Sequence, residues 1–420
     1  MIPCAGWKIP IRGTKLDNQE PTVGKWTDEV GKAVSDLSAP GQFALNAEQR
    51  AIRDLALSFA TEQIAPYAIK WDQEKFFPRD VVRRAAALGF GGVCVAEDVG
   101  GSALSRLEGV LIYDGLATGC PCISGYFSVH NMVASVIDRF GNEQQRKRWL
   151  PRLCKFELLG AYCLTEPASG SDASALKTRA VHDGGGYVLN GVKQFISGAG
   201  DADVYIVMAR TGTAGARGIS AFVVEKGTEG LSFGPVEKKM GWNAQATRQV
   251  ILDDVRLPAE NLLGTEGSGF RIAMSALDGG RLNIAACSLG GARTALNKAS
   301  AYMKERVAFG RPLAQFQALQ FRVADMATEL EVAQTFLWRA ASALDLKETN
   351  ATLLCAMAKR FVTDAGFKIA NEALQLFGGY GYLSDYGVEK IVRDLRVHQI
   401  LEGTNEIMRV IIARSLLEPR

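Results

Sequence analysis

A carboxylate near the C-terminal end of the chain stands in a setting that could make it a strong base. Glu402 follows two large apolar residues, Ile400 and Leu401, and precedes Gly403. Burial of such a side chain in a poorly hydrated pocket would raise its pKa above the ordinary glutamate value of ~4.3. Removal of a proton next to a carbonyl needs a base of this kind, with hydrogen-bond donors for the developing enolate oxygen. The same pattern also suits an ordinary acid at a helix N-terminus, where it interacts with the helix dipole.

A loop in the middle of the chain could hold a flat, polar ligand. The segment 162–172 combines several hydroxyl side chains with Pro167, which fixes a turn, and Gly170, which exposes backbone N–H groups. These groups can hydrogen-bond the edge of a planar ring and a polar chain. An ordinary loop that leads into a β-rich region has the same composition, so the loop alone does not identify a ligand.

A segment further along pairs an aromatic ring with a hydroxyl group. Phe195 and Ser197 are two residues apart, which places both side chains on one face of a strand. The ring of Phe195 could cover one face of a cofactor while the Ser197 hydroxyl bonds to the cofactor's edge. Packing at the end of a strand is the commoner reason for such a pair.

Two glycine-rich segments, 264–269 and 378–382, do not lie between a strand and a helix of a βαβ unit. We therefore do not expect a Rossmann dinucleotide fold, and the sequence contains no Walker motif. The chain has eight cysteines and three histidines, and the closest cysteines, Cys120 and Cys122, have no histidine beside them. This pattern favours free thiols in a reducing compartment over a zinc site.

The overall composition limits the classes of partner. The chain has 48 Lys and Arg against 45 Asp and Glu, and a net charge of +3 does not indicate a nucleic-acid partner. No apolar run approaches the ~20 residues that cross a bilayer, so we expect no membrane span. Residues 1–40 lack the apolar core of a secretory signal and carry more acidic residues than a mitochondrial presequence usually does. Their sequence does not argue for a targeting role.

The periodicity of apolar residues divides the chain into three parts. Helical spacing runs from about 46 to 155, where Asn46 and Gln49 can form a capping box, and further helices are expected from Arg79 and around Asn142. Between 160 and 270 short β-rich runs alternate with turns, and Asn190-Gly191 predicts a hairpin turn between residues 187–189 and 194–196. These strands predict an antiparallel barrel or sandwich.

Long helices return after about residue 272, including segments 321–336 and 351–376, and they predict an antiparallel four-helix bundle. We therefore divide the chain into an N-terminal extension (1–40), a helical domain (41–160), a β-domain (161–270) and a C-terminal helical bundle (271–420).

Five segments, in this order, resemble the acyl-CoA dehydrogenase family. They are the loop 162–167, the strand 195–197, and the segments 306–312, 375–382 and 401–406. Each is weak by itself, but five collinear segments over about 240 positions are specific. The resemblance covers the chain from about Ala44 to the end, and it implies the fold of that family: a helical domain, a β-domain and a four-helix bundle.

The resemblance also implies a cofactor, FAD, held without a Rossmann unit. The residues expected around the flavin ring are Tyr162, Cys163, Leu164, Thr165, Ser171, Phe195, Ile196 and Ser197. The residues expected around the dinucleotide part, in a neighbouring subunit's FAD, are Arg306, Phe316, Gln317, Gln375, Leu376, Phe377, Gly378 and Gly379. Thr404, Asn405 and Glu406 would close around the same cofactor. The implied substrate contacts are Ser171, Asp278, Gly279, Gly280, Arg281 and Arg414.

The implied reaction is the α,β-dehydrogenation of an acyl thioester. Glu402 would take the α-proton, and the β-hydrogen would leave as a hydride to flavin N5. Some members of the family carry their catalytic glutamate at the position that is Gly280 here, so Glu402 is the remaining candidate. One departure is Ala168, which stands where the family commonly has a glycine in this loop.

The expected substrate is a short branched acyl-CoA. Segments 278–290, 397–403 and 89–93 are most similar to the family members that oxidise isobutyryl-CoA to methacrylyl-CoA in valine breakdown. A pocket distinguishes one methylene by only ~1–3 kcal/mol, so overlap with 2-methylbutyryl-CoA and butyryl-CoA is expected. The resemblance further implies a homotetramer, an electron-transferring flavoprotein as electron acceptor, and the mitochondrial matrix, with a bacterial cytoplasm as the alternative.

Two other functions are considered for the same residues. An acyl-CoA oxidase would use the same base and flavin but would pass electrons to oxygen, and oxidases usually carry an additional C-terminal helical domain. A flavoprotein scaffold without activity would be expected to lack the carboxylate, and Glu402 is present. A visible absorption band would identify a flavoprotein, and peroxide release would distinguish an oxidase from a dehydrogenase.

Overall fold

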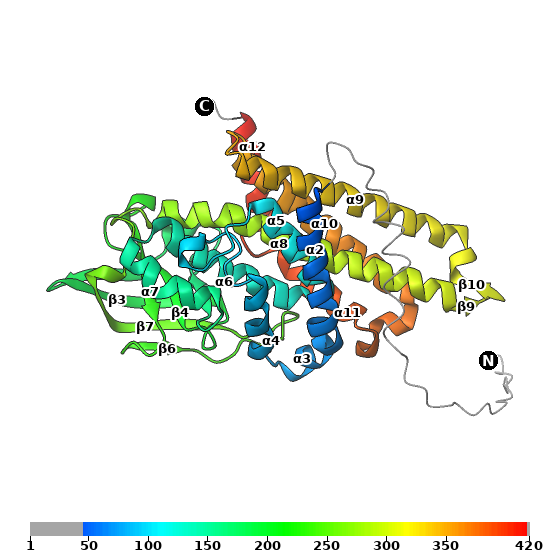
Figure 1. Ribbon diagram of the computed structural model, residues 1–420, viewed down its shortest axis with the longest axis horizontal. Coiled ribbons are helices and arrows are strands. Elements are labelled where there is room, and N and C mark those ends of the chain that lie inside the picture. Colours follow the sequence, from blue (N-terminus) through cyan, green and yellow to red (C-terminus); the bar gives the residue numbers. More distant parts are fainter. Residues whose placement is uncertain (1–44, 418–420) are drawn as a thin grey trace, which may run out of the picture. The chain divides into compact units, whose positions relative to one another are not determined.

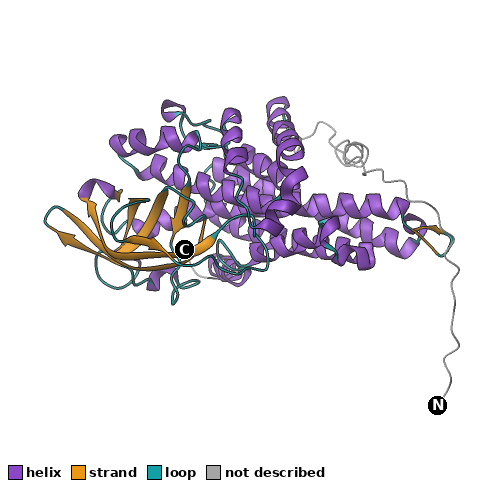
Figure 2. Cartoon of the chain, turned by 90° about the horizontal axis from the view of Figure 1, so that it is seen from below, coloured by secondary structure: helices purple, strands orange, loops and turns teal. Residues whose placement is uncertain are grey.

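The computed structural model describes residues 45–417. The predicted N-terminal extension, residues 1–40, lies outside the described residues. From residue 45 onward the chain forms a helical region, a sheet and a second helical region, as the sequence predicts (Figures 1 and 2).

Six helices make up the first region. They are α2 (Ala47–Phe59), α3 (Ala68–Glu74), α4 (Arg79–Arg84), α5 (Arg106–Gly119), α6 (Pro121–Phe140) and α7 (Glu143–Cys154). The predicted capping box of Asn46 and Gln49 starts α2, and equivalent boxes start α5 and α7. Most residues of α5 and α6 are buried, and these two helices form the centre of this region.

The middle region is one sheet of eight strands. The strands are β1 (Gly160–Cys163), β2 (Arg179–Asp183), β3 (Gly186–Ser197), β4 (Val204–Arg210), β5 (Ile219–Glu225), β6 (Leu231–Phe233), β7 (Thr247–Pro258) and β8 (Leu262–Leu263). Their order is β6-β7-β3-β2-β4-β5-β8, with β1 paired to β4. Most pairs are antiparallel, but β1 and β2 each run parallel to β4. The described strands therefore form an open, mixed sheet and not the closed antiparallel barrel that was one of the two expected forms.

The hairpin predicted at Asn190-Gly191 is wrong. Residues 186–197 form the single strand β3, and the turn lies earlier, at Gly184 and Gly185, which both have positive φ. Asn190 and Gly191 instead form an irregularity within β3, where the pairing with β7 shifts by one residue. An added Cβ at Gly191 would lie 2.8 Å from Cα of Thr178. The close approach of the backbone at Thr178 therefore requires glycine at position 191.

The C-terminal region is built on a helix of 37 residues, α8 (Gly269–Glu305). It is followed by the short pair β9 (Val307–Ala308) and β10 (Arg311–Pro312) and by α9 (Gln317–Asp345), α10 (Ala351–Phe377), α11 (Val388–Arg396) and α12 (Asn405–Leu417). Helices α8, α9, α10 and α11 pack together as the predicted bundle, and α12 packs against α10. Helix α8 runs from the sheet to the β9–β10 pair, and its middle also packs against α5 and α6 (Figure 1).

The sheet contributes to two apolar cores, because β4 is buried on both faces. Tyr205 and Val207 point into the core shared with the N-terminal helices and the bundle. Val204, Ile206 and Met208 point into a second core beneath α6 and α7. The β-domain is thus packed between helices, and its strand ends face α6 and α8.

The seven cysteines of the described part have free thiols. Between residues 45 and 417 no helix is long and apolar enough to cross a membrane. Within the same range no cluster of histidine, cysteine and acidic side chains could hold a metal ion.

Candidate active site

A cavity of about 300 Å³ lies where the strand ends of the sheet meet α6, α8 and the segment before α12. Its walls come from residues distant in sequence, including Met132 of α6, Phe195 of β3, Leu277 and Ile284 of α8, and Glu402. The volume is at the lower end of the range for small-molecule sites, about 300–1,000 Å³. Most of the lining is apolar, so the few polar groups in it define what the cavity can do.

The carboxylate of Glu402 is the central polar group. Its Oε2 atom is buried and has no hydrogen-bond partner among the described residues. Burial raises the pKa of Glu402 to about 7, although the cations Arg281 and Lys359 act in the opposite direction. A buried, unpaired carboxylate with such a pKa is suited to take a proton from a bound molecule at neutral pH.

The backbone at Glu402 has an unusual conformation that directs this side chain. Glu402 has φ +58° and Gly403 has φ +89°, both in the left-handed region. The two residues turn the chain between the 3₁₀ segment Val397–Gln399 and α12, and the side chain of Glu402 returns toward α8. Non-glycine residues adopt this conformation where the surroundings enforce it, and active sites are common places for it.

Gly280 provides the space for the carboxylate. A Cβ atom added at Gly280 would overlap Oε2 and lie 2.9 Å from Cδ of Glu402. The position at which some family members carry their glutamate therefore contacts the Glu402 side chain directly. Gly279 faces elsewhere, because a Cβ there would lie 2.8 Å from Nη1 of Arg106.

Arg281 connects α8 to the Glu402 turn. Its Nη1 donates to Asp278 Oδ1 at 2.7 Å, and its Nε makes a longer hydrogen bond of 3.4 Å to the backbone oxygen of Glu402. Asp278 also accepts a hydrogen bond from Thr352 on α10. Of the predicted substrate contacts on α8, Arg281 lines the cavity, while Asp278 is engaged in holding Arg281.

The predicted flavin loop contributes another part of the cavity lining. Tyr162, Leu164, Thr165 and Ser171 line the cavity, whereas Cys163 points into the apolar core of the sheet. The hydroxyl of Tyr162 is buried without a partner among the described residues, and burial raises the pKa of this phenol. An unpartnered hydroxyl in the wall is an available hydrogen-bonding group for a bound molecule.

A buried ion pair fixes the loop to the sheet. Nζ of Lys193 on β3 donates to Oε1 of Glu166 at 2.7 Å and to the carbonyl of Leu164. The Glu166 carboxylate also accepts the backbone N–H groups of Lys177 and Thr178. The loop therefore has a defined position before any ligand binds.

Phe195, Ile196 and Ser197 all line the cavity, but simple strand alternation does not place them there. Phe195 has φ +59°, and the pairing of β3 with β7 shifts between Lys193 and Ile196. This bulge turns the Phe195 ring into the cavity, where 65% of the residue is exposed. An exposed aromatic ring on a cavity wall can cover one face of a planar ligand.

The second predicted cofactor group lies at the far end of α8. Arg306 follows the last residue of that helix, 26 positions after Gly280, which is roughly 40 Å along the helix (Figures 1 and 2). Its guanidinium stacks on Tyr380 at 5.4 Å, and Phe316 lies under Arg311 nearby. None of this group lines the cavity: Arg306, Phe316, Gln317, Gln375, Leu376, Phe377, Gly378 and Gly379.

Within this second group the side chains differ in exposure. Gln317, Gln375 and the two glycines Gly378 and Gly379 are exposed, and Leu376 and Phe377 are buried in the bundle core. The exposed members are available to a molecule outside this chain.

The side chains of the predicted residues after Glu402 also lie in different surroundings. The side chain of Asn405 is buried and bonded to Lys359, Thr363 and Asp364 of α10, so it faces the bundle. Thr404 accepts the backbone N–H of Ile407 and caps α12. Glu406 and Arg414 lie on the exposed side of α12.

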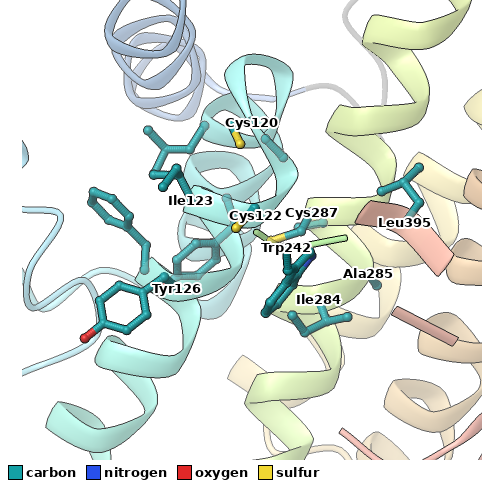
Figure 3. Close-up of a cluster of buried hydrophobic side chains, with 14 of the residues drawn as sticks. Cys120, Cys122, Ile123, Tyr126, Trp242, Ile284, Ala285, Cys287 and Leu395 are labelled. Carbon is teal, nitrogen blue, oxygen red and sulfur yellow. The ribbon is translucent and has the colours of Figure 1, made fainter. Parts of the chain in front are cut away.

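The sequence did not identify Trp242 as a site residue. Its indole lies between α6 and α8 beside Ile284, and it lines the cavity (Figure 3). The indole N–H donates to Nε2 of His398 at 3.2 Å. Nδ1 of His398 therefore carries the ring proton and donates it to the hydroxyl of Ser288. Burial lowers the pKa of His398 to about 3, which keeps this imidazole neutral. No motif marks Trp242 in the sequence, because its contacts come from three separate regions.

A buried base faces a cavity wall that can bind a flat ring, within a fold of helices, sheet and helices. These features define an enzyme that abstracts a proton beside a planar cofactor. Models of the N-terminal, middle and C-terminal domains of acyl-CoA dehydrogenases match residues 46–157, 161–255 and 267–417. The chain belongs to the acyl-CoA dehydrogenase family.

Individual relatives are similar over most of their length. The protein named "Isobutyryl-CoA dehydrogenase, mitochondrial" from Bos taurus is 54% identical over 374 residues, 89% of this chain and 90% of that protein. The protein of the same name from Dictyostelium discoideum is 54% identical over 373 residues, 89% of this chain and 90% of that protein. The structure of butyryl-CoA dehydrogenase from Megasphaera elsdenii is 38% identical with a TM-score of 0.87, and the match covers 90% of this chain and all of that one. These findings confirm the predicted fold and the predicted enzyme class, an acyl-CoA dehydrogenase with FAD as its cofactor.

Proposed function

We propose that this oxidoreductase catalyses the α,β-dehydrogenation of isobutyryl-CoA to methacrylyl-CoA, a step of valine catabolism, with Glu402 as the base that takes the α-proton. The observation that carries this proposal is the unpartnered carboxylate of Glu402, which is buried in the cavity with a pKa of about 7. The two relatives named isobutyryl-CoA dehydrogenase support the choice of substrate.

The cavity residues fit the ring end of FAD. Phe195 would cover one face of the ring, and Thr165 and Ser197 would hydrogen-bond its edge. The unpartnered hydroxyl of Tyr162 supplies a further polar contact on the same wall. When bound, FAD supplies the acceptor for the β-hydrogen that leaves as hydride.

The protein's own groups account for the proton transfer. Glu402 lies against Gly280, which leaves its carboxylate free to approach a thioester in the cavity. The backbone N–H of Glu402 would donate to the thioester oxygen and stabilise the enolate that forms as the α-proton leaves. Apolar side chains around the carboxylate exclude water and keep it a strong base.

The apolar part of the cavity suits a small acyl group. Met132, Leu277, Ile284 and Leu401 form its walls, and they offer no hydrogen-bonding group to the acyl chain. We expect Arg281 and Ser171 to contact the polar part of the substrate. A dehydrogenase with a preference for butyryl-CoA or 2-methylbutyryl-CoA is the alternative within the same class.

The second cofactor group supports an assembly of several copies. Arg306, Gln317 and Gln375 are exposed and far from the cavity of their own chain, so they would hold the dinucleotide part of a neighbouring subunit's FAD. We propose a homotetramer on this basis. An electron-transferring flavoprotein is the proposed electron acceptor, and a solved structure whose title names such a flavoprotein contains a chain that is 41% identical to this one, with a TM-score of 0.88. The mitochondrial relatives favour the mitochondrial matrix, while bacterial relatives leave a bacterial cytoplasm as the alternative.

An anaerobic titration of the purified, FAD-loaded enzyme with a panel of acyl-CoAs tests the proposed substrate. We expect isobutyryl-CoA to bleach the flavin band with the highest kcat/KM, followed by 2-methylbutyryl-CoA and butyryl-CoA. An optimum for long, straight acyl chains would contradict the proposal. Stoichiometric peroxide release in air would identify an oxidase instead.

A further inference from the structure

We infer that Lys359 is a positioning residue for the reaction: its buried ammonium holds the turn at Glu402 and Gly403 and so directs the Glu402 carboxylate into the cavity. This inference rests on the proposed role of Glu402 as the base. Lys359 lies on α10, outside the cavity lining, and neither the sequence motifs nor the resemblance pointed to it.

Both hydrogen bonds of the Lys359 ammonium are made to the segment that follows Glu402. Its Nζ donates to the backbone oxygen of Gly403 at 2.8 Å and to Oδ1 of Asn405 at 2.9 Å. The residue is fully buried. One side chain thus fixes the residue immediately after the base and the first residue of α12.

The Glu402 turn depends on contacts of this kind. Its carboxylate Oε2 has no partner among the described residues, so hydrogen bonding at that atom does not hold the side chain in place. The direction of the side chain is therefore set by the backbone, which is in the left-handed region at both Glu402 and Gly403. On the other side, Arg281 makes only a long hydrogen bond of 3.4 Å to the backbone oxygen of Glu402. The shorter hydrogen bond from Lys359 is the stronger restraint.

Asn405 extends the restraint into the bundle. Its Nδ2 donates to Asp364 Oδ1 at 2.7 Å and to the hydroxyl of Thr363 at 3.0 Å. Both partners lie one turn along α10 from Lys359. The start of α12 is therefore fixed to α10 by three neighbouring side chains, and Lys359 alone among them also reaches the residue next to the base.

Burial of the Lys359 ammonium is energetically unfavourable, because the charge must be desolvated. Cys355, Ala358 and Val362 around it on α10 are buried and small or apolar, and an apolar side chain would pack there without desolvation of a charge. Burial lowers the pKa of Lys359 to about 7, while the nearby Glu402 carboxylate acts in the opposite direction. A cation at this place favours the ionised form of the base, which is the form that accepts a proton.

The experiment compares Lys359→Met, Lys359→Gln and Glu402→Gln in the FAD-loaded enzyme. Methionine removes both the charge and the hydrogen bonds, and glutamine removes the charge but keeps a donor. Three quantities are measured: the flavin content, the affinity for the product methacrylyl-CoA, and the rate of anaerobic flavin reduction by isobutyryl-CoA between pH 5 and 9.

For Lys359→Met we expect flavin content and product affinity within about twofold of the unsubstituted enzyme. The reduction rate should fall on the order of 10–100-fold, because a displacement of the base by ~1 Å has effects of that size. The midpoint of the pH profile should rise, because a cation that lowers the pKa of Glu402 is gone. Lys359→Gln should recover part of the rate and keep the raised midpoint.

The groups that could influence this midpoint come from every element around Glu402. They are Asp278 and Arg281 on α8, Cys287 deeper in α8, Lys359 and Asp364 on α10, His398 before the turn, Glu406 on α12 and Tyr162 on β1. All except Lys359 are unchanged in the two lysine variants. Lys298→Met serves as the control. Lys298 lies on α8, 18 positions after Gly280, where it bonds to the backbone of Tyr386, and it makes no contact with the turn. It should behave like the unsubstituted enzyme.

Each outcome decides between the two claims. If Lys359→Met keeps the unsubstituted rate and midpoint while Glu402→Gln is not reduced, the role of Lys359 is wrong and the role of Glu402 stands. If Glu402→Gln is still reduced by substrate, the proposed base is wrong. If Lys359→Met does not retain flavin, Lys359→Gln decides: a raised midpoint supports the inference, and an unchanged midpoint contradicts it. Loss of flavin in both lysine variants would assign Lys359 to folding and would also overturn the inference.

Discussion

At the scale of single residues, the pKa of the Glu402 carboxylate results from two opposed effects. Burial among apolar side chains favours the neutral acid and raises the pKa of Glu402 to about 7, while Arg281 and Lys359 favour the charged form. A base is most effective when its pKa lies near the working pH, because it is then both ionised and strongly basic. The site thus has a base tuned by its surroundings and not by a direct hydrogen bond to its carboxylate.

This balance predicts a pH dependence of the chemical step. Only ionised Glu402 can accept the α-proton, so the rate of flavin reduction by isobutyryl-CoA should rise with pH and level off above about pH 7. The raised pKa places this rise above the range expected for an ordinary glutamate, ~4.3. Anaerobic stopped-flow measurements between pH 5 and 9 would check it. A rate already constant at pH 5 would contradict the environment described for Glu402.

Single residues differ in how far the sequence reveals them. Glu402 could be selected as a candidate from the sequence, because it lies in a short segment with chemistry of its own, and it lines the cavity. Lys359 could not, because it lies within a helical pattern and lysines are rarely found fully buried. The side-chain hydrogen bonds of Asn405 to α10 could not be predicted either, because local sequence does not contain the direction of that side chain.

At the scale of elements, the site depends on a direct contact between α8 and the turn before α12. Gly280 has no side chain, and the carboxylate of Glu402 occupies the space that a Cβ would fill. The helix and the turn can therefore approach closely at this one position. The position of the Glu402 carboxylate in the cavity is therefore set by the packing of the turn backbone against α8.

The variant Gly280→Ala tests this contact. An added methyl group would displace the carboxylate, and we expect the rate of flavin reduction to fall on the order of 10–100-fold while flavin remains bound. Gly109→Ala on α5 is the matched control, because a Cβ there would meet its nearest neighbour at an ordinary 3.5 Å. Stopped-flow reduction of both variants would decide, and equal rates in the two would refute the importance of the Gly280 contact.

Helices with one apolar face could be placed individually, whereas the more buried helices α5 and α6 could only be assigned to the helical region 46–155. The predicted helical segment 351–376 is α10, Ala351–Phe377, because its sequence has helical spacing and a glycine follows its end. Most residues of α5 and α6 are buried, so neither helix has a broad exposed face. With few exposed positions, their sequence does not mark where each of the two helices begins and ends.

In the sheet, the strands could be predicted better than their partners. The β-rich runs 203–209, 219–224 and 249–255 in the sequence predict strands, and they correspond to β4, β5 and β7. The Asn190-Gly191 signal misled, because this residue pair, which also forms tight turns, lies within β3 opposite an extra residue of β7 and close to Thr178. The parallel pairing of β1 with β4 joins segments about 40 residues apart, and local sequence gives no sign of it.

At the scale of the whole molecule, the two predicted halves of the cofactor site lie at opposite ends of α8. Glu402 contacts Gly280 near the sheet, and Arg306 lies beyond the other end of the helix, roughly 40 Å away. The sequence placed both groups around FAD by resemblance alone. Their separation within one chain is the reason to expect that subunits complete each other's sites.

The variant Arg306→Ala tests that expectation. We expect the Kd for FAD to rise about tenfold or more, because a hydrogen bond to a charged group contributes ~1.5–3 kcal/mol. With saturating FAD the rate of flavin reduction should stay within about twofold, since the cavity is unchanged. Lys304→Ala, two positions earlier and also exposed, is the control. Unchanged FAD affinity in Arg306→Ala, measured by fluorescence titration, would count against a shared site.

The most direct test of the account is the variant Glu402→Gln, with the flavin band followed under anaerobic conditions as isobutyryl-CoA is added. Glutamine keeps the size and polarity of the side chain but cannot take the α-proton, so we expect a yellow protein that binds the thioester and is not bleached. Bleaching at a rate near that of the unsubstituted enzyme would show that another group removes the proton.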